Sequence, residues 1–391
     1  MSRIDELIAE LAPRGVEVKA LGEVGKFIRG NGLQKADLRD AGFPAVHYGQ
    51  IHTHYGVWAT ETKSFTDENI AVKLRHARPG DLLIATTSED DDAVAKATAW
   101  LGNTDVALSG DAYIYRHELE PKYMSYFFQS TSFQDQKRRF VSGTKVRRVS
   151  GDSLAKIRIP VPPLEVQREI VRVLDQFTQL EAELEAELEA RRRQNEHYLH
   201  AAVLPDGDLE WTTLGDATTN HDRRRKPVTR SDRKEGEFPY YGANGIQDYV
   251  HDFIFDGTFL LVGEDGSVKN ADGTPVLNWA SGKIWVNNHA HVLTASSEQF
   301  SLRYLYYYLA TVDVTAYVTG GTQPKINQKN LNSIPVPVIA RDFQDRVVEI
   351  LDRFDALVND LSVGLPAELA ARRKQYEYYR DKLLTFEEAA A

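Results

Sequence analysis

The chain has 391 residues, of which 42% are hydrophobic and 27% charged, so it is long enough for two or three globular domains. It contains no cysteine, which excludes disulfide bonds and thiolate metal sites and favours a reducing compartment. The net charge is −10 at pH 7, the N-terminus is polar, and no apolar stretch is long enough to span a bilayer. These features predict a cytoplasmic protein, neither secreted nor membrane-spanning.

The first half of the chain opens with a short predicted helix at residues 2–12, which we expect to mimic the end of a helical repeat. Strands and an aromatic helical segment follow, at 82–87, 111–116 and 123–129. The stretch GDSLAKIRIPVPPLEVQREIVRVLDQF, residues 151–177, then combines a strand with the start of a long helix. Pro162 and Pro163 mark that start, because proline suits the first turn of a helix and not its interior.

The second half repeats this order. Strands are predicted at 253–266 and 283–288, with Asp-Gly hairpin signals at 256–257, 265–266 and 272–273. An aromatic helical segment follows at 302–310, and Pro337 is expected to mark the start of a second long helix. The stretch QKNLNSIPVPVIARDFQDRVVEILDRF, residues 328–354, aligns without a gap with residues 151–177, and nine positions are identical.

The repeat extends in both directions from this unit. GVEVKALGEV (15–24) parallels DLEWTTLGDA (208–217), and ARRRQNEHY (190–198) parallels ARRKQYEYY (371–379). The chain is therefore two copies of one long module, and we expect its C-terminal helix to return near the N-terminus in a pseudo-two-fold particle.

Both long helices carry apolar residues at alternating spacings of four and three. This pattern is typical of a coiled-coil seam, and the two seams favour pairing of the helices with each other. The alternative is that each helix packs on its own domain. We expect a break in the second helix at Gly364-Leu365-Pro366. The seam residues are Val166, Ile170, Val173, Phe177, Leu180 and Leu184 in the first helix, and Phe343, Val347, Ile350, Phe354, Leu357 and Leu361 in the second.

The predicted fold class is α+β: two mixed α/β domains joined by two long helices that pair as an antiparallel coiled coil. The predicted boundaries are a first domain at 1–162, a central helix at 163–205, a second domain at 206–340 and a C-terminal helix at 341–391.

Basic side chains are concentrated in two runs, although the net charge argues mildly against a nucleic-acid partner. Residues 137–148 carry six Lys or Arg and no acid, and residues 221–234 carry seven against two Asp. Each run alone is most simply a solvated face, but two such runs in comparable halves favour a shared binding role.

Enzymatic motifs are missing. The sequence has no phosphate-binding loop, no dinucleotide or methyl-donor fingerprint, no adenine-methyltransferase motif and no nucleophile elbow. The histidines at 47, 52, 54, 289 and 291 lack nearby acidic or cysteine partners in the sequence, so we predict no metal site. The acidic run at 90–92 is interpreted as a solvated loop rather than a nuclease centre.

The doubled pattern of a small-Gly-Thr loop, basic or amide residues, Leu-x-x-Ile, Pro-Val, Gln and a long helix resembles the specificity (S) subunit of type I restriction–modification enzymes, over essentially the whole chain. FPYYGANGIQDYV at 238–250 and PAVHYGQI at 44–51 resemble two variants of that family's recognition domains.

This resemblance implies a non-catalytic DNA reader with two target recognition domains, each reading one half of a split, asymmetric sequence. It also implies that the helices set the spacing and dock two methyltransferase (M) subunits, to which motor/nuclease (R) subunits bind. No cofactor is expected in this chain, since S-adenosylmethionine, ATP and Mg would reside on partner subunits. The alternatives are a stand-alone or defence-associated DNA-binding protein of this architecture, and an enzyme with an unrecognised active site.

Within the readers, we align the loop 143–148 with the loop 321–327. Lys and Arg can neutralise phosphates, while Arg suits guanine and Gln or Asn suits adenine. Simple hairpin packing is the alternative role for the aromatic candidates. The predicted DNA-binding residues are His47, Tyr48, Gln50, Lys145, Arg147, Arg148, Arg223, Arg224, Arg225, Lys226, Tyr240, Tyr241, Asn244, Gln323, Lys325 and Asn327.

Overall fold

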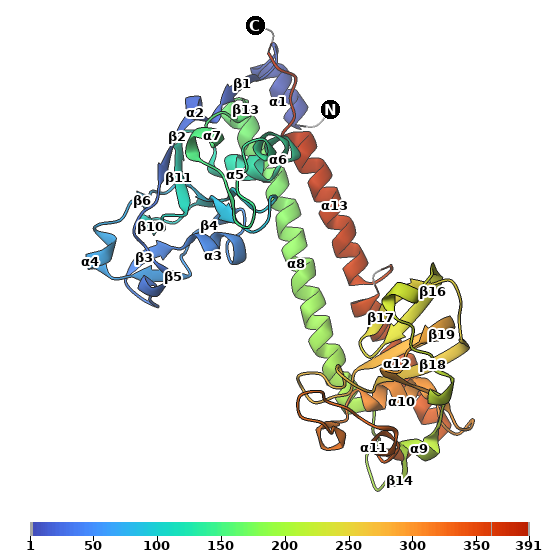
Figure 1. Ribbon diagram of the computed structural model, residues 1–391. Coiled ribbons are helices and arrows are strands. Elements are labelled where there is room, and N and C mark those ends of the chain that lie inside the picture. Colours follow the sequence, from blue (N-terminus) through green and yellow to red (C-terminus); the bar gives the residue numbers. More distant parts are fainter. Residues whose placement is uncertain (1–2, 361, 390–391) are drawn as a thin grey trace. The chain divides into compact units, whose positions relative to one another are not determined.

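The computed structural model describes residues 3–360 and 362–389. The chain divides into two compact units, Met1–Glu183 with Leu369–Ala391, and Leu184–Glu368. Each unit mixes short strands with helices (Figure 1), which confirms the predicted fold class.

The first unit is built on two small sheets. A five-stranded sheet has the order β2 (Gly25–Arg29), β11 (Ala112–His117), β7 (Leu82–Ala85), β9 (Lys96–Trp100), β4 (Trp58–Ala59). A four-stranded sheet has the order β5 (Ser64–Thr66), β3 (Phe43–Val46), β10 (Val106–Leu108), β6 (His76–Ala77). The helices are α1 (Arg3–Leu11), α2 (Leu21–Val24), α3 (Tyr48–Thr53), α4 (Glu68–Ala71), α5 (Pro121–Gln129), α6 (Thr131–Arg138) and α7 (Gly151–Leu154), and β8 (Thr87–Ser88) pairs with β12 (Arg147–Arg148).

The second unit is built on one six-stranded sheet. Its order is β15 (Thr218–Asn220), β20 (Ala290–Ala295), β18 (Phe255–Gly263), β19 (Leu277–Val286), β16 (Glu235–Gly242), β17 (Gly245–Val250). Its short helices are α9 (Leu214–Ala217), α10 (Leu302–Leu309) and α11 (Gln328–Asn332). One predicted hairpin is wrong, because Asp256-Gly257 lies inside β18, whose pairing with β19 continues past it.

The sequence repeat is a repeat of structure. In the first unit β1 (Glu17–Ala20) pairs antiparallel with β13 (Arg158–Val161), and in the second β14 (Glu210–Thr213) pairs antiparallel with β21 (Pro335–Val338). The register is the same, since Glu17 faces Val161 and Glu210 faces Val338. The two modules therefore share one closing element, in which distant strands meet.

Pro337 does not mark the start of a helix. It lies within β21, and the helix α12 begins four residues later at Arg341. Proline is tolerated there because a strand in a two-stranded sheet has one edge that needs no ladder hydrogen bond.

The second long helix has the predicted break. α8 (Leu164–Ala202) is continuous over 39 residues, whereas the second helix is divided into α12 (Arg341–Asn359) and α13 (Leu365–Leu383) (Figure 1). A Cβ atom at Gly364 would lie 2.4 Å from the carbonyl oxygen of Ala356, so the break requires glycine.

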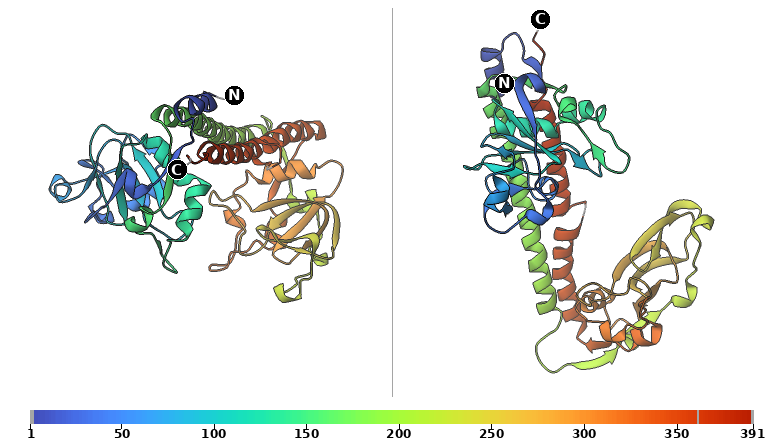
Figure 2. Two further views of the ribbon diagram at one scale, coloured as in Figure 1. Left: turned by 90° about the horizontal axis from the view of Figure 1, so that it is seen from above. Right: turned by 60° about the vertical axis from the view of Figure 1, so that its left-hand side comes forward.

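In the first unit, α13 runs antiparallel to the first half of α8 (Figure 2). The ring of Phe177 stacks on Tyr379 with centroids 5.5 Å apart, and the Glu181 carboxylate lies 2.6 Å from the Arg373 guanidinium. Phe177 therefore has the helix partner that the seam predicts.

The rest of the seam departs from a continuous coiled coil. Val166 and Ile170 are fully buried in the core of the first unit, and Val347 belongs to that of the second, so these helix segments pack on their own domains. Leu180, Ile350 and Leu357 are 50%, 47% and 37% exposed, so the prediction of one buried seam is wrong at these positions. Val173, Leu184, Phe343 and Phe354 are half-buried, and Leu361 lies outside the described residues.

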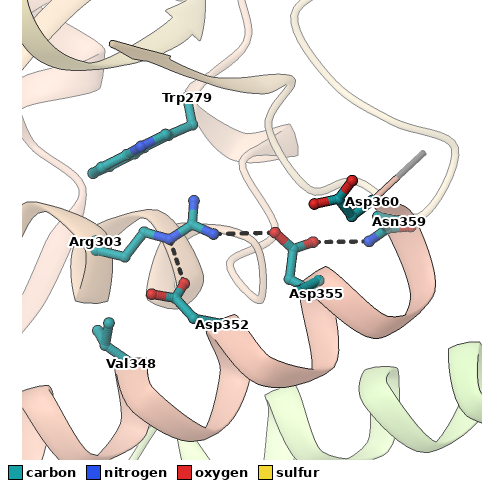
Figure 3. A pocket seen from close by; sticks show the side chains of 8 residues that line it. Trp279, Arg303, Val348, Asp352, Asp355, Asn359 and Asp360 are labelled. Carbon is teal, nitrogen blue, oxygen red and sulfur yellow. Dashed lines mark hydrogen bonds and ion pairs between the residues drawn. The ribbon is translucent and has the colours of Figure 1, made fainter. Parts of the chain in front are cut away.

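In each unit, one cationic side chain joins the aromatic helix (α5 in the first unit, α10 in the second) to a long helix. In the second unit, the Arg303 guanidinium lies 2.7 Å from the Asp352 carboxylate and 3.1 Å from that of Asp355, beneath the ring of Trp279 (Figure 3). In the first, the Lys122 ammonium lies 2.7 Å from the Asp175 carboxylate and 3.7 Å from the centre of the Trp58 ring. Asp175 and Asp352 are identical positions of the repeat, so both modules use the same anchor.

The C-terminal segment returns to the first unit, as predicted. The Val16 N–H donates to the carbonyl of Glu387 at 2.9 Å, and the Ala389 N–H donates to that of Val16 at 3.1 Å. Within the described ranges, no helix is both long and apolar enough to cross a membrane.

Candidate nucleic-acid interface

Two loops of identical construction follow the aromatic helices. The first is closed by a bridge between Ser142 and Arg148, and the second by a bridge between Thr319 and Lys325, at an offset of 177 residues. Both turn at a glycine in the left-handed region, Gly143 with φ +95° and Gly320 with φ +85°. This shared backbone is the geometric unit of the candidate interface.

The structure corrects our alignment of the two loops by one residue. Gly143 corresponds to Gly320 rather than Gly321, so the counterpart of Gln323 is Val146. The offset of 177 also places Ser150 opposite Asn327, and both residues cap the helix that follows. The loops therefore keep the register of the strand–helix unit.

The first loop presents Lys145 and Arg148 as exposed side chains. Arg147 is held by an acidic loop, since its Nε lies 2.9 Å from the Asp91 carboxylate. Lys137, from the same basic run, is buried and donates to the carbonyls of Asp92 and Val94, both at 2.9 Å. Burial lowers the pKa of Lys137 to about 8. The basic run is thus divided between structural and exposed cations.

The second loop presents Gln323 as an exposed amide. The ammonium of Lys325 lies 3.0 Å from the Glu264 carboxylate. Asn327 accepts a hydrogen bond from the Asn330 N–H at 2.9 Å, so its side-chain oxygen caps α11 rather than facing outward.

The basic run of the second unit is also divided. The Arg225 side chain is only 12% exposed and lies 2.5 Å from the Glu264 carboxylate. Arg224 covers the ring of Phe255 and donates to the carbonyl of Ile254 at 2.9 Å. Arg223 and Lys226 are exposed. These two cations can meet a phosphate, as can Arg230 and Lys234 of the same run, which are also exposed.

The PAVHYGQI segment uses its polar groups to build α3. His47 caps that helix by accepting from the Gly49 N–H at 3.3 Å, and Gln50 accepts from the His47 N–H at 3.0 Å while donating to Ser64. Burial lowers the pKa of His47, with the Lys35 charge acting in the same direction and Asp111 opposing it. His47 and Tyr48 line a cavity of about 280 Å³, whereas Gln50 does not.

The aromatic candidates of the second unit belong to its core. Tyr240 is 1% exposed and Tyr241 8%, so hairpin packing, the alternative for these residues, is correct for both. The Tyr240 hydroxyl accepts from the Val228 N–H at 3.0 Å, and Arg233 covers its ring. Asn244, at the turn between β16 and β17, is exposed.

Sequence reasoning missed a cluster of buried charges beneath the second loop. Asp222, Glu264 and His291 place one polar atom each within 4.8 Å of one another. Arg225 and Lys325 offset their negative charge, and every one of these side chains has a hydrogen-bonding partner. The residues come from four separate segments of the chain, so no local pattern signals their meeting.

The sequence matches the family described as "Type I restriction modification DNA specificity domain" in two places, residues 13–190 and 208–371. The two matched ranges cover most of both modules. The second range begins just before β14, the first strand of the second copy.

Named relatives carry the same description. A putative type I restriction enzyme specificity subunit of Haemophilus influenzae is 39% identical over 190 residues, which is 48% of this chain and 49% of that protein. The EcoR124I/EcoR124II specificity subunit of Escherichia coli is 32% identical over 272 residues, 63% of this chain and 67% of that protein. The alignment thus spans about half the length of the first relative.

Solved structures share the fold at low identity. The type I S subunit from M. genitalium has a TM-score of 0.55 at 16% identity, covering 94% of this chain and 96% of its own. A structure described as the basis of complex assembly and conformational transition of the type I R-M system has a TM-score of 0.61 at 18% identity, covering 95% and 97%.

Proposed function

The chain belongs to the type I restriction modification DNA specificity domain family, and we propose that it is the non-catalytic DNA-recognition subunit of a type I restriction–modification complex. Each module supplies one recognition domain, and each domain reads one half of an asymmetric, bipartite target.

One observation carries this proposal: two loops with the same backbone present different side chains. Lys145 and Arg148 are exposed on the first loop, and Gln323 is exposed on the second. Arginine can pair with guanine through two hydrogen bonds, and glutamine can do so with adenine. A repeated scaffold with unlike readers suits a target whose two halves differ.

The same proposal identifies the partners. Two methyltransferase subunits dock on the long helices and methylate adenine, and motor/nuclease subunits join through them. S-adenosylmethionine, ATP and Mg are held by those subunits, and the complex works in the cytoplasm. α8, at 39 residues and 1.5 Å per residue, is about 58 Å long, which exceeds the ~34 Å between half-sites one helical turn apart.

Methylation mapping tests the proposal. The chain is co-expressed with a type I methyltransferase subunit from the same genome in a host without adenine methylation, and the host genome is sequenced by a single-molecule method. We expect methyl-adenine in one split, asymmetric motif. Co-purification of the two proteins without any methylation contradicts the DNA-reading role, and purified chain that binds DNA without a methyltransferase partner supports a stand-alone DNA-binding protein.

A further inference from the structure

The second loop is fixed to the sheet by backbone contacts on both sides of Lys325. The Thr319 and Lys325 backbones exchange hydrogen bonds of 2.8 and 2.7 Å. The Gly266 N–H donates to the carbonyl of Pro324 at 3.0 Å, and the Ile326 N–H donates to that of Glu264 at 2.9 Å. The loop that carries Gln323 therefore rests on the segment that follows β18.

His291 lies under this loop and is 1% exposed. Its Nε2 is 2.8 Å from the carbonyl oxygen of Ile326, and its Nδ1 is 2.6 Å from the carboxylate of Asp222. A backbone carbonyl can only accept, so Nε2 must carry a hydrogen.

Nδ1 must carry a hydrogen as well, because the Asp222 carboxylate is ionised. Burial acts to raise the pKa of Asp222, but the carboxylate also accepts from the Val292 N–H at 3.0 Å and lies 3.4 Å from the Arg225 guanidinium, and these contacts are among those that lower that pKa. An ionised carboxylate only accepts, so both ring nitrogens are donors and the ring is an imidazolium.

The surrounding charges accommodate this cation. Asp222 accepts from it directly, and the Glu264 carboxylate lies 3.8 Å from Nδ1. Glu264 also meets Arg225 at 2.5 Å and Lys325 at 3.0 Å, while His289 pairs with Asp265 on the neighbouring turn. The network thus links the loop, the basic run at 222–225 and the strand β20.

We propose that the buried ring of His291, which donates from both nitrogens, is a positioning residue that holds the loop 319–326 in its reading conformation. What this inference says about DNA recognition rests on the proposed function. What it says about the conformation of the loop rests on geometry alone. Without the ring, the Ile326 carbonyl and the Asp222 carboxylate lose these donors. A buried acceptor without a donor is costly, so the loop loosens when the ring is removed.

Amide hydrogen exchange on the full chain tests the loop part without DNA. His291→Leu removes both donors, and we expect exchange in residues 319–326 to accelerate at least tenfold while residues 142–149 stay unchanged. His291→Gln supplies one amide group as donor, so it should restore part of the protection. His251→Gln, an exposed histidine of the same unit, is the matched control. Unchanged exchange in His291→Leu, or an equal acceleration in His251→Gln, overturns the proposal.

The methylation pattern produced by the co-expressed complex then distinguishes the positioning role of His291 from the DNA-reading role of the loop. In a strain carrying His291→Leu, the motif should become degenerate in one half-site and keep the other, with partial rescue by His291→Gln. A loosened loop with an unchanged motif refutes the reading role of that loop and leaves the positioning role intact. A complex that never methylates, with loop exchange as expected, places the failure in the proposed function.

Discussion

Phe177 stacks on Tyr379 with ring centroids 5.5 Å apart, and their repeat counterparts Phe354 and Tyr198 stack with centroids 5.3 Å apart. Each pair joins the middle of one copy's helix to a tyrosine near the end of the other copy's helix. In the first pair the first copy supplies the phenylalanine, and in the second pair the second copy supplies it. The internal duplication therefore extends to the contacts that the long helices make.

Replacing Tyr379 with alanine should lower the free energy of unfolding of the first unit by about 1–2 kcal/mol, because it removes the aromatic stack and part of its buried area. Urea unfolding monitored by circular dichroism measures this. Tyr378→Ala is the control, since that neighbouring side chain is 61% exposed. Equal losses in the two variants would show that the stack contributes nothing specific.

The exposed loop side chains should act on separate half-sites. Arg148→Ala should relax one half of the methylated motif and Gln323→Ala the other, each by the ~1–3 kcal/mol of a bidentate base contact. Sequencing of methylated adenines reports both halves at once, so each variant is the control for the other. If both variants relax the same half, the assignment of one loop to each half-site is wrong.

Arg147 and Asp91 should act as one unit that shapes the first loop. Because the Arg147 Nε lies 2.9 Å from the Asp91 carboxylate, Arg147→Ala and Asp91→Asn should weaken DNA binding similarly, and the double variant should be no worse than either single one. Affinity for a duplex bearing the mapped motif measures this. Additive losses would indicate that Arg147 contacts DNA directly.

Acidification should destabilise the first unit through His117. Burial lowers the pKa of His117 to about 4, although the charge of Asp81 opposes this, whereas a histidine in the unfolded chain has a pKa of about 6.5. The unfolded state therefore binds the proton first, and stability that is present above pH ~6.5 is lost as pH falls towards about 4. His117→Phe should flatten this part of the curve of unfolding midpoint against pH, and His54→Phe, at an exposed position, is the control. An unchanged curve in His117→Phe would exclude His117 as the source.

Inserting one heptad between residues 173 and 187 should lengthen the spacer between the methylated half-sites, because α8 is continuous through this segment. Motif mapping measures the spacer, and a heptad removed from the same place should shorten it. Insertion of seven residues in the exposed turn at 207–208 is the control. A spacer that stays constant in both helix variants would show that α8 does not set it.

The duplication, the mixed α/β class, the long helices and the break at Gly364 could all be predicted from the sequence, because each depends on local chemistry: identical residues at a fixed offset, apolar periodicity, and a glycine and proline in series. The two loops follow the same offset. Our alignment of them was wrong by one residue, because the sequence does not show which of Gly320 and Gly321 adopts the left-handed conformation.

Which polar residues are available to a partner depends on contacts that the sequence does not reveal. Arg147 and Arg225 look like Arg148 and Arg223 in the sequence, yet the first two meet carboxylates and are partly buried, whereas the last two are exposed. Lys325 meets a carboxylate and is exposed as well. Tyr240 and His291 were placed in the core by strands that pair across the second unit. Burial and ion pairing depend on contacts between segments far apart in the chain, and such contacts produce no periodic pattern in the sequence.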